Sequence, residues 1–127
     1  MPRILIVDDE FGIAEALTDV LGPLGYATAV AENGRLGLQA VAKEPPDLIL
    51  LDVMMPVMSG PEMLQALKAD ARHRDIPVVL MSAVSNTSIS RELHRQAAGF
   101  LQKPFTYDEL MSVLASPLGS GARPGTP

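Results

Sequence analysis

The hydrophobic residues of this chain fall into short runs that are separated by segments with a different spacing of apolar positions. Each run is bounded by polar or turn-forming residues, which is typical of strands buried on both faces of a parallel sheet. Thr28 interrupts one of the runs, so we expect that strand at an edge of the sheet. The expected strands are residues 3–7, 27–30, 48–52, 77–81 and 99–102.

Between these runs, apolar residues recur every three or four positions, as on one face of an amphipathic helix. Pro61 suits the first position of a helix, and Thr106 with Glu109 forms a capping box that predicts the start of the last helix. Residues 86–95 contain few strong helix formers but are still interpreted as a helix. The expected helices are 11–22, a short one through 38–41 that ends before Pro45, 61–69, 86–95, and one that starts at Thr106.

Strands and helices therefore alternate along the chain. This alternation predicts a doubly wound, five-stranded parallel sheet with helices on both faces. A chain of 127 residues is long enough for one domain, which we expect over residues 1–116. Residues 117–127 are mostly Pro, Gly, Ser and Ala and cannot form a core, so we expect a flexible tail or the stub of a linker there.

The net charge and the absence of cysteine exclude several classes of function. The net charge of −5 argues against non-specific binding to nucleic acid or to an anionic membrane. The absence of cysteine excludes disulfides, thiol catalysis and cysteine-based zinc sites. There is no signal-like N-terminus and no apolar run of transmembrane length. We therefore expect a soluble, cytoplasmic protein.

Polar residues follow four of the expected strands, at the point where each strand ends. They are Asp8 with Asp9, then Asp52, Ser82 and Lys103. The carboxyl ends of parallel strands share one edge of a sheet, where ligands of such folds bind. Neighbouring carboxylates repel one another unless a cation lies between them, so we expect Mg²⁺ or Mn²⁺ at this edge.

An aspartate beside such a cation is suited to phosphoryl transfer. Its carboxylate attacks phosphorus as a nucleophile and forms an acyl phosphate. The reaction needs charge neutralisation and in-line positioning more than acid–base chemistry. Asp52 is the expected reactive residue, and Lys103 and the Ser82 hydroxyl would contact the phosphoryl oxygens.

Four motifs together resemble the receiver domain of bacterial two-component response regulators, a CheY-like superfamily. They are Val7-Asp8-Asp9-Glu10, Leu51-Asp52-Val53-Met54-Met55-Pro56 with Gly60, Met81-Ser82-Ala83, and Lys103-Pro104-Phe105, within residues 3–115. The resemblance implies a flavodoxin-like (β/α)5 fold. It also implies a phosphoacceptor, Asp52, that takes its phosphoryl group from a phosphohistidine on a histidine kinase or a histidine phosphotransfer protein. The protein would not be a turnover enzyme.

The resemblance also assigns roles to the surrounding residues. Asp8 and Asp9 would hold the metal with Asp52, and Met54 would add its backbone carbonyl. Ser82 would be the switch hydroxyl and Lys103 the phosphate-binding lysine.

Further positions take their roles from the same resemblance. Phe100 would be the switch aromatic, and the Lys103–Pro104 peptide bond would be cis. Met54 and Val84 would flank the path of hydrolytic water, and since both are apolar we expect a long-lived acyl phosphate. The face formed by the fourth helix, fifth strand and fifth helix would bind a downstream protein.

The sequence departs from the receiver pattern at a few positions. Val57 stands where Gly is common, and Ser59 where Asp is common. Gln96 replaces the usual glycine after the fourth helix, so we expect that helix to lack a left-handed cap. The segment from Ser82 to Lys103 is about one residue shorter than is typical of the family.

Two other interpretations remain open. The chain could be a receiver-like interaction module that works without phosphorylation. It could also be a phosphohydrolase of the haloacid dehalogenase type, although that family has a second aspartate at the position of Met54. Phe100 could be an ordinary core residue, and the acids after the first strand could simply stabilise the start of a helix.

Overall fold

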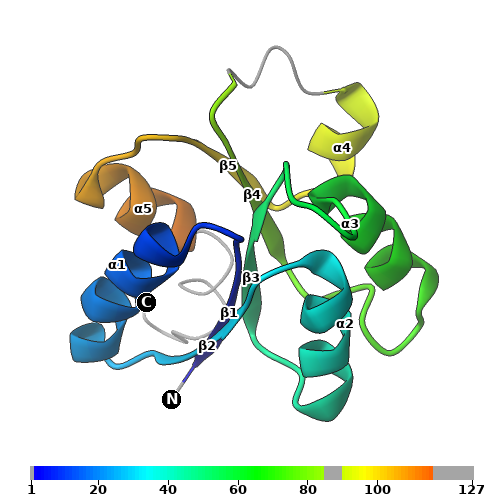
Figure 1. The fold of residues 1–127 in the computed structure, drawn as a ribbon, viewed down its shortest axis with the longest axis horizontal. Helices are drawn as coiled ribbons and strands as arrows, with labels where there is room; N and C mark the ends of the chain where they lie inside the picture. Colours follow the sequence, from blue (N-terminus) through cyan, green and yellow to red (C-terminus); the bar gives the residue numbers. More distant parts are fainter. Residues whose placement is uncertain (1, 85–89, 116–127) are drawn as a thin grey trace.

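The computed structural model describes residues 2–84 and 90–115, and these form a five-stranded parallel sheet flanked by helices (Figure 1). The strand order is β2-β1-β3-β4-β5. It confirms the predicted doubly wound sheet and places β2 at an edge, as the interruption by Thr28 indicated. The strands are β1 (Arg3–Val7), β2 (Ala27–Ala31), β3 (Leu48–Asp52), β4 (Val78–Ser82) and β5 (Gly99–Gln102).

The helices cover both faces of the sheet. Figure 1 shows α1 and α5 on one side and α2, α3 and α4 on the other. A short 3-10 helix, η1 (Gly22–Leu24), follows the first of them. The α-helices are α1 (Phe11–Leu21), α2 (Gly34–Lys43), α3 (Gly60–Ala69), α4 (Arg91–Gln96) and α5 (Tyr107–Leu114).

Alternation along the central strands divides the core into two layers. In β3, Leu48 and Leu50 belong to the layer that contains α1 and α5, whereas Ile49 and Leu51 belong to the layer that contains α2 and α3. Successive side chains of a strand point to opposite faces, so a strand covered on both faces must be apolar throughout. All five residues of β3 are buried, including its last one, Asp52.

Side-chain caps fix the starts of α3 and α5. Thr106 and Glu109 form the predicted capping box. The start of α3 was predicted one residue too late, because the helix begins at Gly60 rather than at Pro61. The reason is a second capping box: Ser59 accepts a hydrogen bond from the Glu62 N–H, and the Glu62 carboxylate accepts one from the Ser59 N–H.

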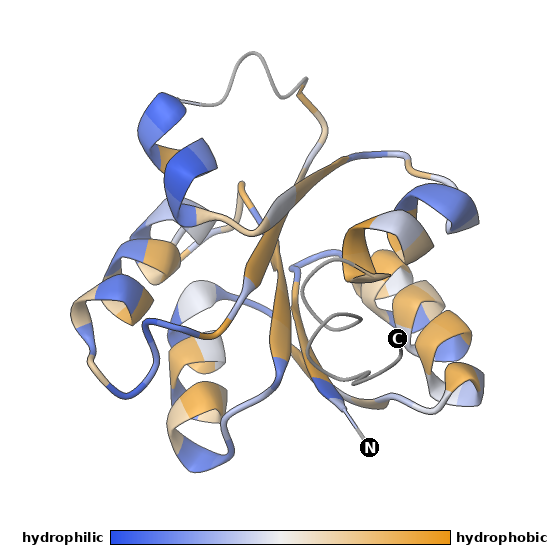
Figure 2. Ribbon diagram, turned by 180° about the vertical axis from the view of Figure 1, so that it is seen from behind, coloured by the Kyte–Doolittle hydropathy of each residue, from blue (hydrophilic) through white to orange (hydrophobic). Residues whose placement is uncertain are grey.

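Helix α4 is shorter than the predicted helix 86–95, of which residues 86–89 lie outside the described part of the chain. Ser90 caps the helix by accepting a hydrogen bond from the Leu93 N–H, which sets its start at Arg91. Its last residue is Gln96, and the following Ala97 is extended, with φ −91°. The expected absence of a left-handed cap is therefore confirmed. Figure 2 shows how hydrophilic this helix is.

Two further predictions concern the C-terminal tail and membrane-spanning helices. The expected tail, residues 117–127, lies outside the described residues, so the division into domain and tail stays a prediction. In the part of the chain that the structure covers, no helix combines the length and apolar character needed to cross a membrane.

Candidate functional site

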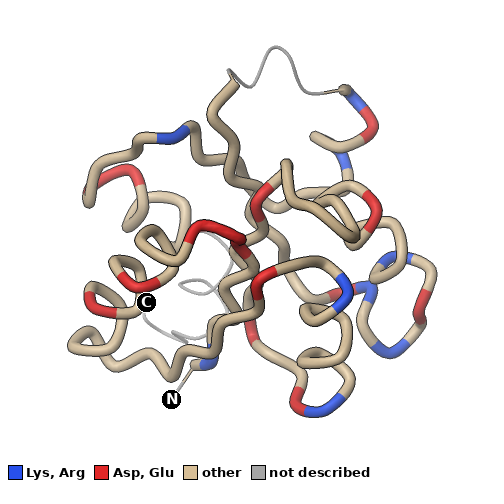
Figure 3. Tube along the Cα trace, in the orientation of Figure 1, with Lys and Arg blue, Asp and Glu red and all other residues tan. Residues whose placement is uncertain are grey.

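The sheet brings the polar residues at the strand ends to one edge. Asp52 is the last residue of β3, and Ser82 is the last residue of β4. Asp8 follows β1, where its N–H donates to the carbonyl of Ala31, and Lys103 follows β5, where its N–H donates to the carbonyl of Ser82. Figure 3 shows acidic residues gathered where β1 leads into α1.

Three carboxylates meet at this edge. Each of Asp8, Glu10 and Asp52 offers one oxygen, and these oxygens all lie within 4.8 Å of one another. Asp8 and Asp52 are 1% and 5% exposed. One oxygen of Asp8, Oδ1, accepts a hydrogen bond from the Glu10 N–H at 2.8 Å, whereas the other, Oδ2, is buried and forms an ion pair with Lys103 Nζ at 2.9 Å.

This donor set fits a divalent cation. Hard cations such as Mg²⁺ and Mn²⁺ prefer oxygen ligands, mainly carboxylates and carbonyls. Asp8 Oδ2, which the Lys103 ammonium already contacts, has a further lone pair that a metal cation could use. The clustered carboxylate oxygens, two of them from buried residues, therefore support the predicted metal site.

The largely buried side chain of a lysine lies against the same carboxylates. Lys103 Nζ is 2.8 Å from Glu10 Oε1, 2.9 Å from Asp8 Oδ2 and 3.3 Å from Asp52 Oδ1. Burial disfavours the ammonium ion, but the contacts with Glu10 and Asp8 and the charge of Asp52 outweigh it and raise the pKa of Lys103 well above its usual range. The lysine is therefore a permanent cation at the strand ends.

The environment of Asp52 opposes its ionisation. Burial and the charge of Asp8 raise the pKa of Asp52 from 3.8 to about 6, and Lys103 offsets part of this effect. The more distant charge of Asp9 acts in the same direction as Asp8. A cation bound by these carboxylates would favour the ionised form of Asp52.

Two of the three predicted carboxylate ligands lie in the acidic cluster, and the third does not. Asp8 and Asp52 belong to the cluster, but Asp9 is exposed and Glu10 takes the third place in it. Sequence reasoning missed Glu10, although its position in the acidic run after β1 was a signal for it. The roles of Asp9 and of the Met54 carbonyl as ligands stay predictions.

The two predicted switch residues lie on neighbouring strands. Ser82 is buried, and its Oγ accepts a hydrogen bond from the Val84 N–H at 3.1 Å. Phe100 on β5 is half-buried and packs against the core layer of α2 and α3. Its ring lies 5.9 Å, centre to centre, from that of His94 on α4. In the sheet register Phe100 lies beside Leu80, two residues before Ser82, and its ring contacts α4.

Three other predicted residues lie around this edge. The Lys103–Pro104 peptide bond is cis, as predicted. The side chains of Met54 and Val84 are exposed. Both are apolar, so neither could orient or activate a water molecule.

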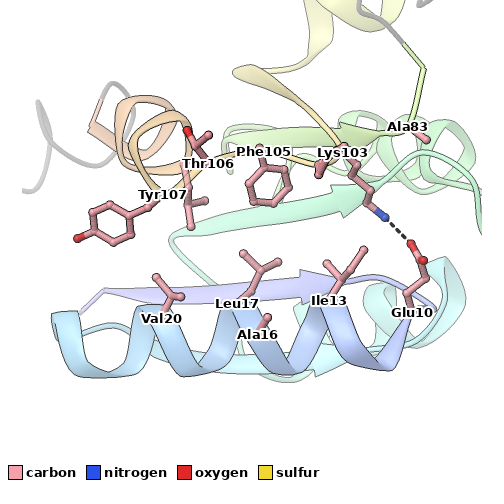
Figure 4. Close-up of a pocket in the computed structure, with 12 residues that line it drawn as sticks. Glu10, Ile13, Ala16, Leu17, Val20, Ala83, Lys103, Phe105, Thr106 and Tyr107 are labelled. Carbon is pink, nitrogen blue, oxygen red and sulfur yellow. Dashed lines mark hydrogen bonds and ion pairs between the residues drawn. The ribbon is translucent and has the colours of Figure 1, made fainter.

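An apolar pocket of about 550 Å³ lies between α1 and α5 and extends to the lysine. In Figure 4, Ile13, Leu17 and Val20 of α1 face Phe105 and Tyr107, and the ion pair between Lys103 and Glu10 closes one end. The charged site and this apolar surface are therefore continuous.

Comparison with known proteins gives consistent matches. A sequence model described as "Response regulator receiver domain" matches residues 4–115. The chain is 40% identical over 111 residues to the DNA-binding response regulator MtrA of Mycobacterium tuberculosis, covering 87% of this chain and 47% of MtrA. It is 39% identical over 113 residues to sporulation initiation phosphotransferase F of Bacillus subtilis, covering 88% and 90%. The chain thus spans about half the length of MtrA.

Solved structures agree with the sequence matches. The response regulator TrrA of Thermotoga maritima, in complex with Mg(2+)-BeF, superimposes with a TM-score of 0.83 at 33% identity, covering 93% of this chain and all of that one. The chemotaxis protein CheY4 of Vibrio cholerae gives a TM-score of 0.82 at 30% identity, covering 93% and 99%.

Proposed function

This chain belongs to the response regulator receiver domain family, and from that premise we propose that Asp52 accepts a phosphoryl group from a phosphohistidine. The proposal rests mainly on one observation: Asp52 is buried, belongs to the acidic cluster and forms an ion pair with Lys103. The donor would be a histidine kinase or a histidine phosphotransfer protein.

The reaction is an in-line displacement at phosphorus. An Asp52 carboxylate oxygen forms the new bond to phosphorus while the bond between phosphorus and the donor imidazole nitrogen breaks. The electron pair of that bond stays on the nitrogen, which leaves as a neutral imidazole once it is protonated. The product is an acyl phosphate on Asp52.

The residues around Asp52 would provide the charge that the reaction needs. Mg²⁺ or Mn²⁺, when bound by Asp8, Asp9, Asp52 and the Met54 carbonyl, would neutralise charge on the transferred group. Lys103 carries a permanent positive charge 3.3 Å from Asp52 and would pair with a phosphoryl oxygen. The hydroxyl of Ser82 would donate to another oxygen.

Phosphorylation would act on the rest of the domain through Ser82 and Phe100. When the Ser82 hydroxyl moves toward the phosphoryl oxygens, the space that it leaves would let Phe100 turn inward. The contact of Phe100 with His94 supports a link to α4. The face formed by α4, β5 and α5 would then change its affinity for a downstream protein. Comparing crystal structures or NMR spectra with and without beryllofluoride tests this, and an unchanged Phe100 rotamer would contradict it.

Radiolabelled acetyl phosphate tests the phosphoacceptor role. We expect one label per chain in the presence of Mg²⁺, and none when EDTA is present or when Asp52 is replaced by Asn. An Asp19→Asn variant is a matched control, because this aspartate is exposed on α1 and outside the cluster. The two other interpretations give different results: a phosphohydrolase would release phosphate rapidly without keeping a label on the chain, and a module that works without phosphorylation would take up no label.

A further inference from the structure

We propose that Glu10 is a positioning residue that holds Lys103 in the unphosphorylated protein and gives up its contact with the lysine when Asp52 is phosphorylated. The inference rests on the proposed function and adds a residue to it. Glu10 would set how readily the lysine becomes available to the phosphoryl group, and thereby how fast the acyl phosphate forms.

The geometry favours Glu10 as the main partner of the lysine. Its carboxylate accepts a hydrogen bond from Lys103 Nζ at 2.8 Å, whereas Asp8 Oδ2 forms an ion pair with Nζ at 2.9 Å and Asp52 Oδ1 lies 3.3 Å away. Figure 4 shows this pair at the end of the pocket between α1 and α5. Lys103 is 11% exposed, so its ammonium ion depends on the carboxylates around it.

The start of α1 leaves the Glu10 side chain available for this contact. Glu10 is the N-cap residue of α1, but its side chain makes no capping hydrogen bond. Asp, Asn, Ser or Thr would be the favoured cap at that position. The Glu10 N–H donates to Asp8, which fixes the backbone of Glu10 beside the cluster. Its side chain can then extend to Lys103.

Of the carboxylates around Lys103, Glu10 is the one that can be displaced most easily. An ammonium ion has three donors, and three carboxylates surround this one. The phosphoryl group takes the place of the Asp52 carboxylate as one of these partners, and it can accept a second hydrogen bond from Lys103 only if Asp8 or Glu10 gives one up. Asp8 is buried, whereas the Glu10 side chain is 59% exposed and can turn into water.

Removing the charge of Glu10 should therefore speed the reaction. In a Glu10→Gln variant, the exposed carboxylate that competes with the incoming group for Lys103 is gone. A largely exposed ion pair has a modest effect, so we expect labelling of Asp52 by acetyl phosphate at saturating Mg²⁺ to be about two- to fivefold faster.

Two further variants separate the contact from the charge. Glu15→Gln removes an exposed acidic side chain from the same helix that lies outside the pocket and the acidic cluster, and it should label at the wild-type rate. Glu10→Asp keeps the charge but shortens the side chain by one methylene. It should label faster than wild type if the contact with Lys103 is what matters.

NMR of the metal-free protein gives a readout that does not depend on activity. We expect the Lys103 side-chain ammonium signal to shift and its protons to exchange faster with water in Glu10→Gln. The Lys68 signal, whose ammonium donates to the carbonyl of Arg74, should not change.

The outcomes distinguish this inference from the proposed function. If the wild-type protein takes up no label on Asp52, the proposed function fails and the inference fails with it. If the wild type is labelled but Glu10→Gln is no faster than Glu15→Gln, only the inference is overturned. An unchanged Lys103 signal in Glu10→Gln would also overturn it.

Discussion

Lys103 Nζ lies 3.3 Å from Oδ1 of Asp52, although these residues stand at the ends of β5 and β3, which β4 separates. The side chain of Lys103 spans that strand, and the hydrogen bond from the Lys103 N–H to the carbonyl of Ser82 fixes its backbone to the end of β4. The position of the lysine therefore depends on the register of three adjacent strands.

The pKa of Asp52 predicts an unusual pH dependence of stability. In the metal-free folded protein this pKa is about 6, against 3.8 for an ordinary aspartate. The folded state therefore binds the proton more tightly than the unfolded state does. The resulting stabilisation is fully present below pH 3.8, and it is lost as pH rises through about 6. It amounts to about 3 kcal/mol at most.

Urea denaturation in EDTA between pH 4 and pH 8 measures this effect. The wild type should lose stability relative to Asp52→Asn as pH rises, because the asparagine side chain of that variant cannot ionise. Mg²⁺ should restore the stability of the wild type at pH 7, where the carboxylates are ionised, but not at pH 4. Parallel pH curves for the two proteins in EDTA would contradict the prediction.

Gly60 lies so close to the backbone of Asp52 that we expect an alanine at position 60 to be poorly tolerated. A Cβ on Gly60 would lie 2.3 Å from the Asp52 carbonyl oxygen and 2.9 Å from Cα of Val53, both backbone atoms. Gly60→Ala must therefore shift the end of β3 or the start of α3. We expect a loss of about 1–3 kcal/mol of stability and slower phosphorylation of Asp52.

Gly12→Ala is the matched control, because nothing lies within 4 Å of a Cβ at that position in α1. Alanine is favoured over glycine inside a helix, so this variant should gain about 0.5–1 kcal/mol. Equal stability of the two variants in urea titrations would refute the argument from close contact.

The backbone of Val57 predicts a stabilising substitution. Its φ is +68°, in the left-handed region that disfavours a β-branched residue. The side chain is 71% exposed, so little packing is lost when it is removed. Val57→Gly should therefore raise the free energy of unfolding by about 0.5–1 kcal/mol, after the larger chain entropy of glycine is included.

Val30→Gly provides the comparison for that measurement. Val30 is also exposed, but it lies in β2 with an ordinary extended backbone. Glycine should destabilise the protein there, because it weakens a strand without relieving strain. The prediction fails if both valine-to-glycine variants lower the thermal midpoint.

The apolar residues Met54 and Val84 predict a long-lived acyl phosphate. An amide at position 54 could orient the attacking water, so Met54→Asn should shorten the half-life about fivefold, the rate equivalent of one hydrogen bond of about 1 kcal/mol. Loss of radiolabel from purified phosphoprotein measures it. Val57→Asn, an equally polar change in the same loop, should leave the half-life unchanged, and an unchanged half-life in Met54→Asn would refute the idea.

Much of the fold was predictable because its signals are local. The apolar run that ends at Asp52 identified the central strand, and Thr106 with Glu109 identified the start of α5. The predicted start of α3 was wrong by one residue, because Pro61 occupies the second helical position rather than the first, after the Ser59 and Glu62 capping box. The bounds of α4 were the poorest prediction, since its sequence has weak propensity and few apolar positions.

The sequence by itself determined the order of strands and helices and the edge at which Asp8, Asp52, Ser82 and Lys103 gather, because parallel strands end on the same side. Only the tertiary structure decided that Glu10 rather than Asp9 joins Asp8 and Asp52 in the acidic cluster. Neighbouring residues in a loop point in different directions, and that choice depends on the local backbone and on a lysine from a distant strand. The acidic run after β1 marked both Asp9 and Glu10 as candidates, but it did not indicate which of them joins the cluster.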